Sequence, residues 1–397
     1  MKKFLLAFLL VVLFSSITLA DAPFHIGLMT ASVSQQEDEY RGAEQLIKEY
    51  GQVSDGGMIN HITCPANFMA ETETTISLIV SFADDPKMKA IVCQDSYPGT
   101  VAAFRKVREL RPDILLLSGT PHEDPEIVSQ AADFCLFADS ISRGYLTVLE
   151  AKKLGADTFV FITFPRHMSF ELLSRMRDIM EVACEDLGLK FIQIGAPDPL
   201  SDVGVAGAQQ FILEKVPAWV EEYGKNTAFF VTNYGLEEPL IKQVAELGAI
   251  YLEGIAPSPT MGYPGALGVK FEESDKGNWP NILKKVEDAV IKAGNAGRMG
   301  TWACSGAYVY TAGLVEHAKR VIEGKSELLN KDDILDAFGK YSSGAKWNST
   351  YYVDADGVVL KNFMLFYQDS YIFGRGYLGQ TSEVIPEKYY DINIGKK

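Results

Sequence analysis

The feature of this sequence that most constrains its fold is a regular alternation of short apolar runs with amphipathic stretches, which begins at Phe24. The apolar runs have the length and residue types of buried strands, while the stretches between them repeat apolar residues at helical spacing. Alternation of this kind builds a mostly parallel sheet that carries helices on both faces. The sequence therefore predicts an α/β fold.

The first series of units runs from Phe24 to about Phe137. Ser34 is predicted to cap the first helix, with Glu37 completing a capping box, and Gly51 to end it. Further helices are predicted at 72–82 and 100–110. Strands are predicted at 25–29, 58–64, 90–93, 114–117 and 134–137.

A second series follows, and it ends in segments of a different kind. Ser169 is predicted to cap a helix that runs to Leu187. Strands are predicted at 158–164, 191–194, 228–231 and 250–252, and helices at 208–223, 237–247, 279–293, 304–322 and 332–338. The tail is predicted to be β-rich, because the turn at 354–357 contains Asp-Gly between apolar runs, which is a strong hairpin signal.

The first 20 residues have the three parts of a secretory signal peptide. Lys2 and Lys3 precede an apolar run at 4–14, and Thr18-Leu19-Ala20 supplies small residues for cleavage. The run is too short to span a bilayer, for which about 20 residues are needed. We expect a periplasmic or otherwise extracytoplasmic protein whose mature chain starts near Asp21. No Cys follows the cleavage site, so a lipoprotein anchor is not indicated.

The remaining length exceeds the usual limit of one core, about 250–300 residues. Two lobes are therefore expected, each built from two pieces of chain. The first is predicted to contain 21–139 plus 260–341, and the second 140–259 plus 342–397. Crossovers near 139–142, 254–259 and 342–347 would form the hinge.

Net charge and cysteine content exclude some classes of partner and of scaffold. The formal net charge is −15, which disfavours nucleic acids and anionic membrane surfaces as partners. The five cysteines are few and odd in number, so a scaffold built on disulfides is not expected, and buried free thiols are the simpler interpretation. They are Cys64, Cys93, Cys135, Cys184 and Cys304.

Motifs at both ends of the mature chain resemble the type I periplasmic solute-binding protein superfamily. Ile26-Gly27-Leu28-Met29, followed by Tyr40-Arg41-Gly42-Ala43 on a helix, is similar to its opening unit. The helices 308–324 and 332–338 and the hairpin sequence 352–357 are similar to its closing part. The pattern is closest to the branched-chain amino-acid-binding branch, although a separate bacterial family of this fold fits as well. The resemblance implies two doubly wound parallel-sheet lobes joined by a hinge, a small polar ligand and an ABC-type permease as partner.

Candidate ligand-binding residues follow from this architecture, because ligands of open parallel sheets bind beyond the carboxyl ends of the strands. Most of them stand just after predicted strands of either lobe, and Ser258 lies beyond the crossover by which the chain returns to the first lobe. The predicted set is Thr30, Ser32, Gln94, Asp95, Tyr97, Ser118, Gly119, Thr120, Arg166, His167, Asn233, Tyr234, Ser258 and Trp302.

The ligand class stays open at this point. Ser118-Gly119-Thr120 is similar to the segment that presents hydroxyl and backbone groups to a ligand carboxylate in the amino-acid-binding branch, and Arg166 could pair with the same group from the other lobe. We therefore expect a carboxylate or comparable anion held by Ser118, Thr120 and Arg166. An ordinary loop and a solvated charge are the alternatives, and aromatic residues such as Trp302 could instead stack on a sugar or nucleoside.

No cofactor, metal or catalytic group is predicted. The segment 374–379 matches G-x-G-x-x-G but follows a β segment with no room for a βαβ unit, so it is not interpreted as a dinucleotide site. His167 has no second histidine at ligand spacing. A non-enzymatic receptor for transport is favoured, with a sensing receptor or, less so, an extracytoplasmic hydrolase as alternatives. A transcriptional regulator is not expected, since no helix-turn-helix is found.

Overall fold

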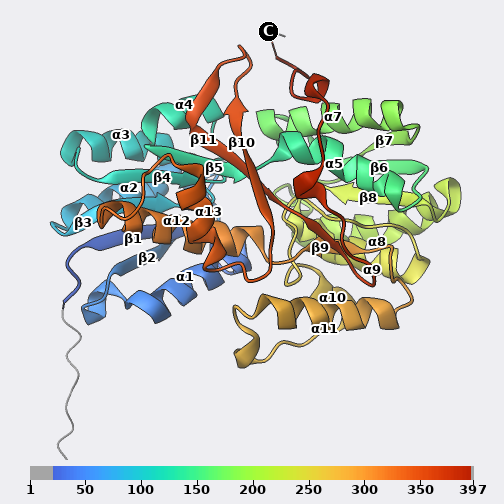
Figure 1. The fold of residues 1–397 in the computed structure, drawn as a ribbon, viewed down its shortest axis with the longest axis horizontal. Helices are drawn as coiled ribbons and strands as arrows, with labels where there is room; N and C mark the ends of the chain where they lie inside the picture. Colours follow the sequence, from blue (N-terminus) through green and yellow to red (C-terminus); the bar gives the residue numbers. More distant parts are fainter. Residues whose placement is uncertain (1–20, 395–397) are drawn as a thin grey trace, which may run out of the picture.

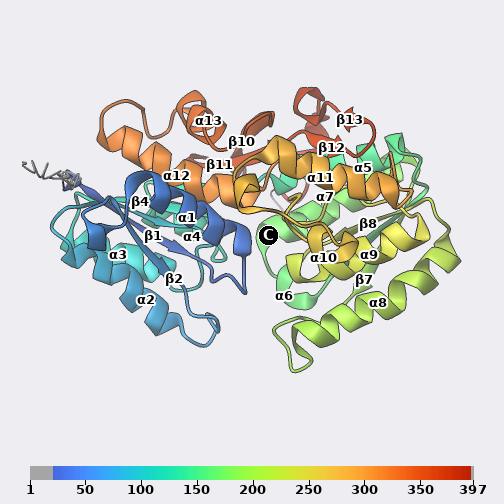
Figure 2. The same ribbon diagram turned by 90° about the horizontal axis from the view of Figure 1, so that it is seen from below.

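The protein is described by a computed structural model that places residues 21–394, and it divides into two α/β lobes that lie side by side (Figure 1). The predicted signal peptide lies outside the described residues. Figure 2 shows the lobes as two halves that are joined along one side. The predicted α/β fold class with two lobes is confirmed.

The first lobe is built on a seven-stranded sheet in the order β10-β11-β5-β4-β3-β1-β2. Its strands are parallel except for β10, which pairs antiparallel with β11. They are β1 (His25–Thr30), β2 (Ile59–Thr63), β3 (Met88–Cys93), β4 (Leu115–Gly119), β5 (Phe134–Ala138), β10 (Trp347–Val353) and β11 (Val359–Gln368). Every residue of β1 is buried, as expected of a strand covered by helices on both faces.

Six helices cover this sheet. They are α1 (Glu37–Tyr50), α2 (Thr72–Ser81), α3 (Thr100–Leu110), α4 (Pro125–Ala131), α12 (Gly306–Ile322) and α13 (Lys331–Gly339). Although α1 and α12 are far apart in the sequence, they pack against each other on one face of the sheet.

The second lobe is built on the parallel strands β7-β6-β8. These are β6 (Thr158–Thr163), β7 (Lys190–Gly195) and β8 (Thr227–Val231). Beside them lies a small sheet of β9 (Gly300–Trp302), β12 (Ser370–Ile372) and β13 (Gly376–Tyr377). The helices are α5 (Ser140–Lys153), α6 (Pro165–Met168), α7 (Glu171–Leu187), α8 (Gly204–Tyr223), α9 (Glu237–Leu247), α10 (Tyr263–Leu267) and α11 (Trp279–Lys292).

The chain crosses between the lobes in three places. It leaves the first sheet at Asp139, between β5 and α5, and returns between β9 and α12. It crosses again at Asp369, between β11 and β12.

Two of the predicted lobe boundaries are therefore wrong. Tyr263, Val286 and Val290 pack into the core of the second lobe, and 347–368 complete the first sheet, where Phe363 pairs with Cys135. The sequence pattern of the hairpin involves neighbouring residues only. Strand β11 is separated from its partner β5 by 220 residues, so the pattern contains no information about that pairing.

Two predicted helix caps are also wrong. Helix α1 begins at Glu37 after Gln36, and Ser34 Oγ instead lies 3.1 Å from Ser32 Oγ. Ser169 follows the short helix α6 and donates to the Arg166 carbonyl, so α7 begins two residues later. In both places a tight turn uses the hydroxyl that the pattern assigned to a cap.

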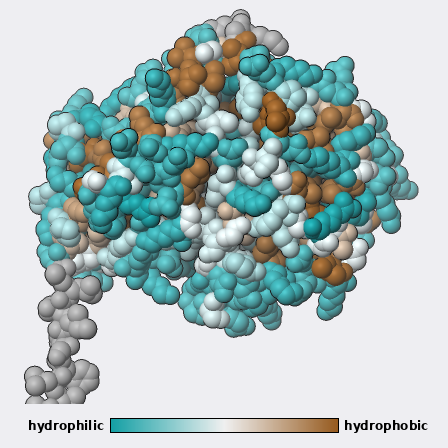
Figure 3. All heavy atoms as spheres, in the orientation of Figure 1, coloured by the Kyte–Doolittle hydropathy of each residue, from teal (hydrophilic) through white to brown (hydrophobic). Residues whose placement is uncertain are grey.

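The surface and the cysteines add two facts. The face shown in Figure 3 is mostly hydrophilic with separate apolar patches, and none of the helices within 21–394 is long and apolar enough to span a bilayer. All five cysteines are buried free thiols, and burial raises the pKa of Cys64 and of Cys184 to about 12.

Gly42, in the motif Tyr40-Arg41-Gly42-Ala43, lets helix α1 approach α12 closely, and this contact leads to a prediction. A Cβ at Gly42 would lie 2.9 Å from the Tyr308 carbonyl oxygen in α12, closer than real Cβ contacts. Overpacking of this kind costs about 1–3 kcal/mol, so Gly42→Ala should lower the free energy of unfolding. Gly339→Ala is the matched control, because a Cβ there meets nothing within 4 Å, and it should raise stability by about 0.5–1 kcal/mol. Urea denaturation measures both; stabilisation by both variants would contradict the prediction.

Candidate functional site

A cavity of about 720 Å³ lies between the two lobes. Its walls come from the carboxyl ends of β3 and β4 with the first turn of α1 on one side, and from the segments after β6 and β8 on the other. Trp302 and Tyr310, at the crossover between β9 and α12, also line it. This is the position where open parallel sheets bind ligands, and the volume lies in the range of small-molecule sites.

The structure brings eight of the fourteen predicted site residues to this cavity. They come from both lobes and from the crossover. They are Asp95, Tyr97, Thr120, Arg166, His167, Asn233, Tyr234 and Trp302.

The other six predicted residues do not line the cavity. Ser118 and Gly119 still belong to β4, and Ser118 Oγ donates to Ser96 Oγ at 2.7 Å inside the lobe. Thr30 ends β1 and donates to the carbonyl of Ala31. These strands run one or two residues further than the pattern predicts, so their last polar residues are buried.

Gln94 and Ser258 are buried outside the cavity lining, and Ser32 is half-buried in the turn before α1. Gln94 Nε2 donates to Thr120 Oγ1 at 2.9 Å and thereby positions a residue that does line the cavity. Ser258 donates to Asp38 at 2.8 Å, which ties the segment between α9 and α10 to helix α1. These residues support the site from behind.

Arg166 is already paired. Its guanidinium donates to both carboxylate oxygens of Asp198, at 2.8 and 2.9 Å. A bidentate pair of this geometry satisfies the arginine charge, so little is left to attract a ligand anion. With Ser118 buried in β4 as well, the expected anion site of Ser118, Thr120 and Arg166 is not assembled.

Acidic side chains dominate the cavity walls, and the sequence analysis missed most of them. Seven carboxylates line the cavity, whereas Arg166 is the one lysine or arginine among its lining residues. They are Glu37, Glu39, Asp95, Glu123, Asp124, Glu171 and Glu238. The sequence could have predicted Glu39 as a site residue, because the first turn of the helix after β1 stands at the same sheet edge as the strand ends.

Glu39 and Asp95 form the most deeply buried part of this acidic wall. Glu39 is 1% exposed and accepts from the Ala31 backbone N–H at 3.1 Å. Burial raises the pKa of Glu39 well above its usual value, and the neighbouring Asp95 carboxylate adds to the shift. Asp95 accepts from the Tyr97 hydroxyl at 3.0 Å.

The backbone at this edge is strained. Asp95 has φ of 53° and Thr120 has φ of 44°, and both are non-glycine residues in the left-handed region. Such conformations cost about 1–3 kcal/mol each and concentrate at ligand clamps and active sites. They turn the chain so that both residues line the cavity.

Aromatic rings form the remaining walls. Phe68 and Tyr97 are stacked with centroids 4.0 Å apart, and His122 meets Phe170 of the second lobe at 5.6 Å. Tyr234 faces them from the segment after β8. Aromatic rings of both lobes therefore line the cavity.

His167 is a neutral wall residue. Its burial, with the nearby Arg166 charge, lowers the pKa of His167 to about 3, and Nδ1 lies 3.2 Å from Thr232 Oγ1. Among the residues that the structure describes, no group of three or more His, Cys, Asp or Glu side chains is placed to hold a metal ion.

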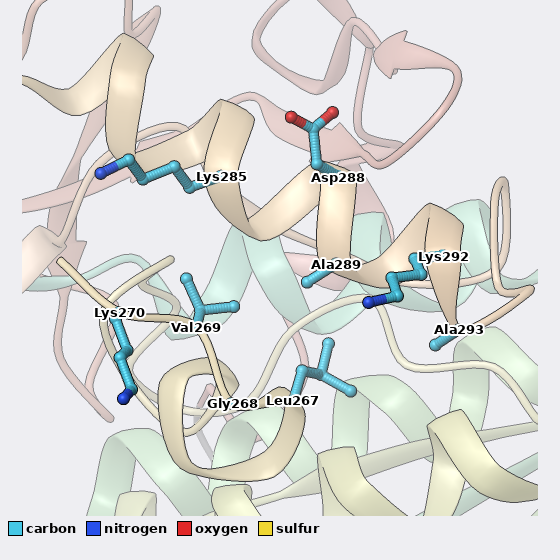
Figure 4. Close-up of a pocket in the computed structure, with 9 residues that line it drawn as sticks. All are labelled: Leu267, Gly268, Val269, Lys270, Lys285, Asp288, Ala289, Lys292 and Ala293. Atoms are coloured by element: carbon cyan, nitrogen blue, oxygen red, sulfur yellow. The ribbon is translucent and has the colours of Figure 1, made fainter.

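A second hollow, of about 550 Å³, lies on the surface of the second lobe between α10 and α11 (Figure 4). Leu267 and Val269 face Ala289 of α11 across it, with lysines around it. Of these, Lys285 is paired with Asp275 at 2.6 Å. The hollow belongs to one lobe and does not lie at a sheet edge, so the interlobe cavity is the stronger candidate site.

Comparison with known proteins gives the family. A family model described as "Protein of unknown function (DUF3798)" matches residues 24–300. The chain belongs to this family. Two proteins of Treponema pallidum (strain Nichols), both described as uncharacterized, are 41% identical over 184 residues and 34% identical over 221 residues. These matches cover 46% and 56% of this chain, and 83% and 100% of the relatives.

Solved structures share the fold of this DUF3798 member. A candidate transcriptional regulator from Clostridium difficile 630 aligns with a TM-score of 0.72 at 24% identity, over 88% of this chain and 99% of that one. A periplasmic solute-binding protein of an ABC transporter from Actinobacillus succinogenes 130z, with bound D-allose, aligns with a TM-score of 0.52 at 16% identity, over 77% and 93%. The superfamily predicted from the sequence is supported as a fold.

Proposed function

We propose that this protein is an extracytoplasmic solute-binding protein, which captures a small polar ligand between its lobes and delivers it to an ABC-type permease. The observation that carries the proposal is the interlobe cavity, because both lobes and a crossover contribute walls to it. A site divided in this way rewards closure of the lobes about their hinge. The signal-peptide pattern of residues 1–20 supports export.

The surroundings of the cavity support closure as well. Val33 on one lobe, and Leu200 and Val205 on the other, line the cavity and are 43–49% exposed. When closure removes these apolar side chains of opposite lobes from water, the free energy of the closed form is lowered. The ligand class that the branched-chain amino-acid-binding branch would imply is not carried over, because the anion site of that hypothesis is not assembled here.

A sensing receptor is the second candidate. Closure around a ligand would then be recognised by a membrane kinase or chemoreceptor instead of a permease, and the cavity serves either role. Catalysis is not proposed, and the ABC solute-binding neighbour is a binding protein.

Binding at the interlobe cavity can be tested by filling each hollow with the same side chain. Ala307 lines the interlobe cavity and Ala293 lines the surface hollow. Native mass spectrometry of the purified protein, incubated with a low-molecular-mass extract of its host cells, should show a small-molecule adduct on the wild type and on Ala293→Trp. Ala307→Trp should lose it, because an indole occupies the space of the ligand.

Solution scattering completes the test. The adduct-bearing wild type should have a smaller radius of gyration than the same protein after the ligand is removed by mild denaturation and refolding. An adduct that persists on Ala307→Trp, or a wild type that carries none, would contradict the proposed function.

A further inference from the structure

The charge balance of the interlobe cavity constrains what can occupy it. Its walls hold seven carboxylates, and the charge of Arg166 is already compensated by Asp198. Several of the carboxylates are satisfied locally: Glu123 accepts from the Val101 N–H, and Asp124 caps α4. Glu39 and Asp95 differ, because they are buried side by side and no lysine or arginine is paired with either in the described part of the chain.

Two carboxylates buried together are costly unless a positive charge or shared protons compensate them. His122 approaches Asp95 only to 3.7 Å. Burial and the neighbouring Asp95 carboxylate both raise the pKa of Glu39, which shows that its charge is poorly compensated by the protein alone. A ligand that brings its own positive charge would compensate the pair more fully, since it supplies both the charge and several hydrogen-bond donors.

Within residues 21–394, two unpaired acceptors on the cavity wall favour a ligand that brings hydrogen-bond donors, whereas Trp302 Nε1 is an unpaired donor on the same wall. Gln36 is 4% exposed and lines the cavity, and its Oε1 has no hydrogen-bond partner within the described residues. Glu171 Oε2, also on the cavity wall, has none either, while Oε1 of the same carboxylate accepts from Arg175 at 3.2 Å. Both are acceptors, and buried acceptors normally have a donor.

The rings that surround the acidic pair favour the same kind of ligand. Phe68 and Tyr97 are stacked beside Asp95, and the buried Tyr97 hydroxyl is turned toward its carboxylate. Ring faces attract organic cations, most strongly where water is excluded, and cages of aromatic residues are used to recognise them. The carboxylates and the ring faces would therefore both attract the same positive charge of a ligand.

We propose that the cavity selects a small organic cation, in which an ammonium group donates to Glu39 and Asp95 while an apolar or aromatic body lies between the stacked Phe68–Tyr97 pair and Tyr234. The inference rests on the proposed function and names the ligand class of the same site. A neutral sugar would leave the acidic pair uncompensated, and an anion would be repelled by it.

A matched ligand series tests the proposal by calorimetry. Tyramine, tyrosol and 4-hydroxyphenylacetate share a phenol ring on a two-carbon chain and end in an ammonium, a hydroxyl and a carboxylate. Charge-assisted hydrogen bonds contribute roughly 10- to 150-fold in affinity. Tyramine should therefore bind about 10- to 150-fold more tightly than tyrosol, and 4-hydroxyphenylacetate more weakly than either.

Variants of Glu39 and Asp95 test whether these two carboxylates cause the preference for tyramine. Glu39→Gln keeps an acceptor for the Ala31 N–H but removes the charge, so it should weaken tyramine binding roughly 10- to 150-fold and leave tyrosol nearly unchanged. Asp95→Asn should act in the same direction. Glu73→Gln is the control, because Glu73 is exposed on α2 and is not among the lining residues of the cavity, and it should change tyramine affinity less than threefold.

The outcomes separate this inference from the proposed function. Tyrosol or 4-hydroxyphenylacetate binding as tightly as tyramine would overturn the cation assignment, as would tyramine binding that is absent at millimolar concentration or unaffected by Glu39→Gln. In each of these cases an adduct lost on Ala307→Trp would still support solute binding.

Discussion

Arg143→Met should lower the free energy of unfolding by about 3–5 kcal/mol, because it leaves the buried Glu253 carboxylate without its partner. Arg143 Nε donates to Glu253 at 2.8 Å, and both side chains are fully buried. The other guanidinium nitrogens donate to the carbonyls of Gly254 and Ile255. Urea denaturation monitored by fluorescence and circular dichroism measures the loss.

The effect is large because this network joins all three crossovers. Arg143 follows the first crossover, its guanidinium lies 5.0 Å from the Trp302 ring at the second, and Ser370 at the third donates to Glu253. Loss of Arg143 therefore removes the contact with Trp302 at the second crossover and the charge partner of Glu253, which accepts from the third.

Two controls distinguish burial from charge pairing alone. Lys284→Met breaks an exposed pair with Asp288, and exposed pairs contribute at most about 1 kcal/mol. The double variant Arg143→Met with Glu253→Leu should recover much of the loss, since no unpaired charge remains buried. A loss for Arg143→Met no larger than that for Lys284→Met would contradict the prediction.

Trp302→Ala should cost about 3–5 kcal/mol, the usual range for removal of a buried tryptophan. Trp302 is 1% exposed, and its ring meets Trp347 edge-on at 6.0 Å. Gly306 leaves room for the ring, because a Cβ at that position would lie 2.8 Å from it. Urea denaturation again gives the magnitude.

Trp302→Phe is the informative control. Trp302 Nε1 is a buried donor with no hydrogen-bond partner among residues 21–394, so its removal offsets part of the lost ring area. We expect the stability loss of Trp302→Phe to stay below about 1.5 kcal/mol, as for other conservative core changes. A loss equal to that of Trp302→Ala would show that the indole N–H is satisfied within the protein.

Local patterns in the sequence predicted many of the helices and strands and the sheet edge that carries the candidate site, although α4 and α5 were not among the predicted helices. The strand before Gln94 ends at Cys93, and the helices at 100–110 and 237–247 have the predicted bounds. Such elements follow from side-chain periodicity, which neighbouring residues determine. The rule that ligands bind beyond strand ends placed Asp95, Thr120 and Tyr234 at the cavity for the same reason.

Only the tertiary structure decided which partners these residues have, and hence the charge of the site. Asp198 lies 32 residues from Arg166 and cancels its charge, whereas Glu39 and Asp95 stand on different elements that the sheet brings together. Likewise, the pairing of β11 with β5 assigns the last hairpin to the first lobe. Contacts between distant segments depend on the packing of whole elements, and the periodicity of a single element carries no information about them.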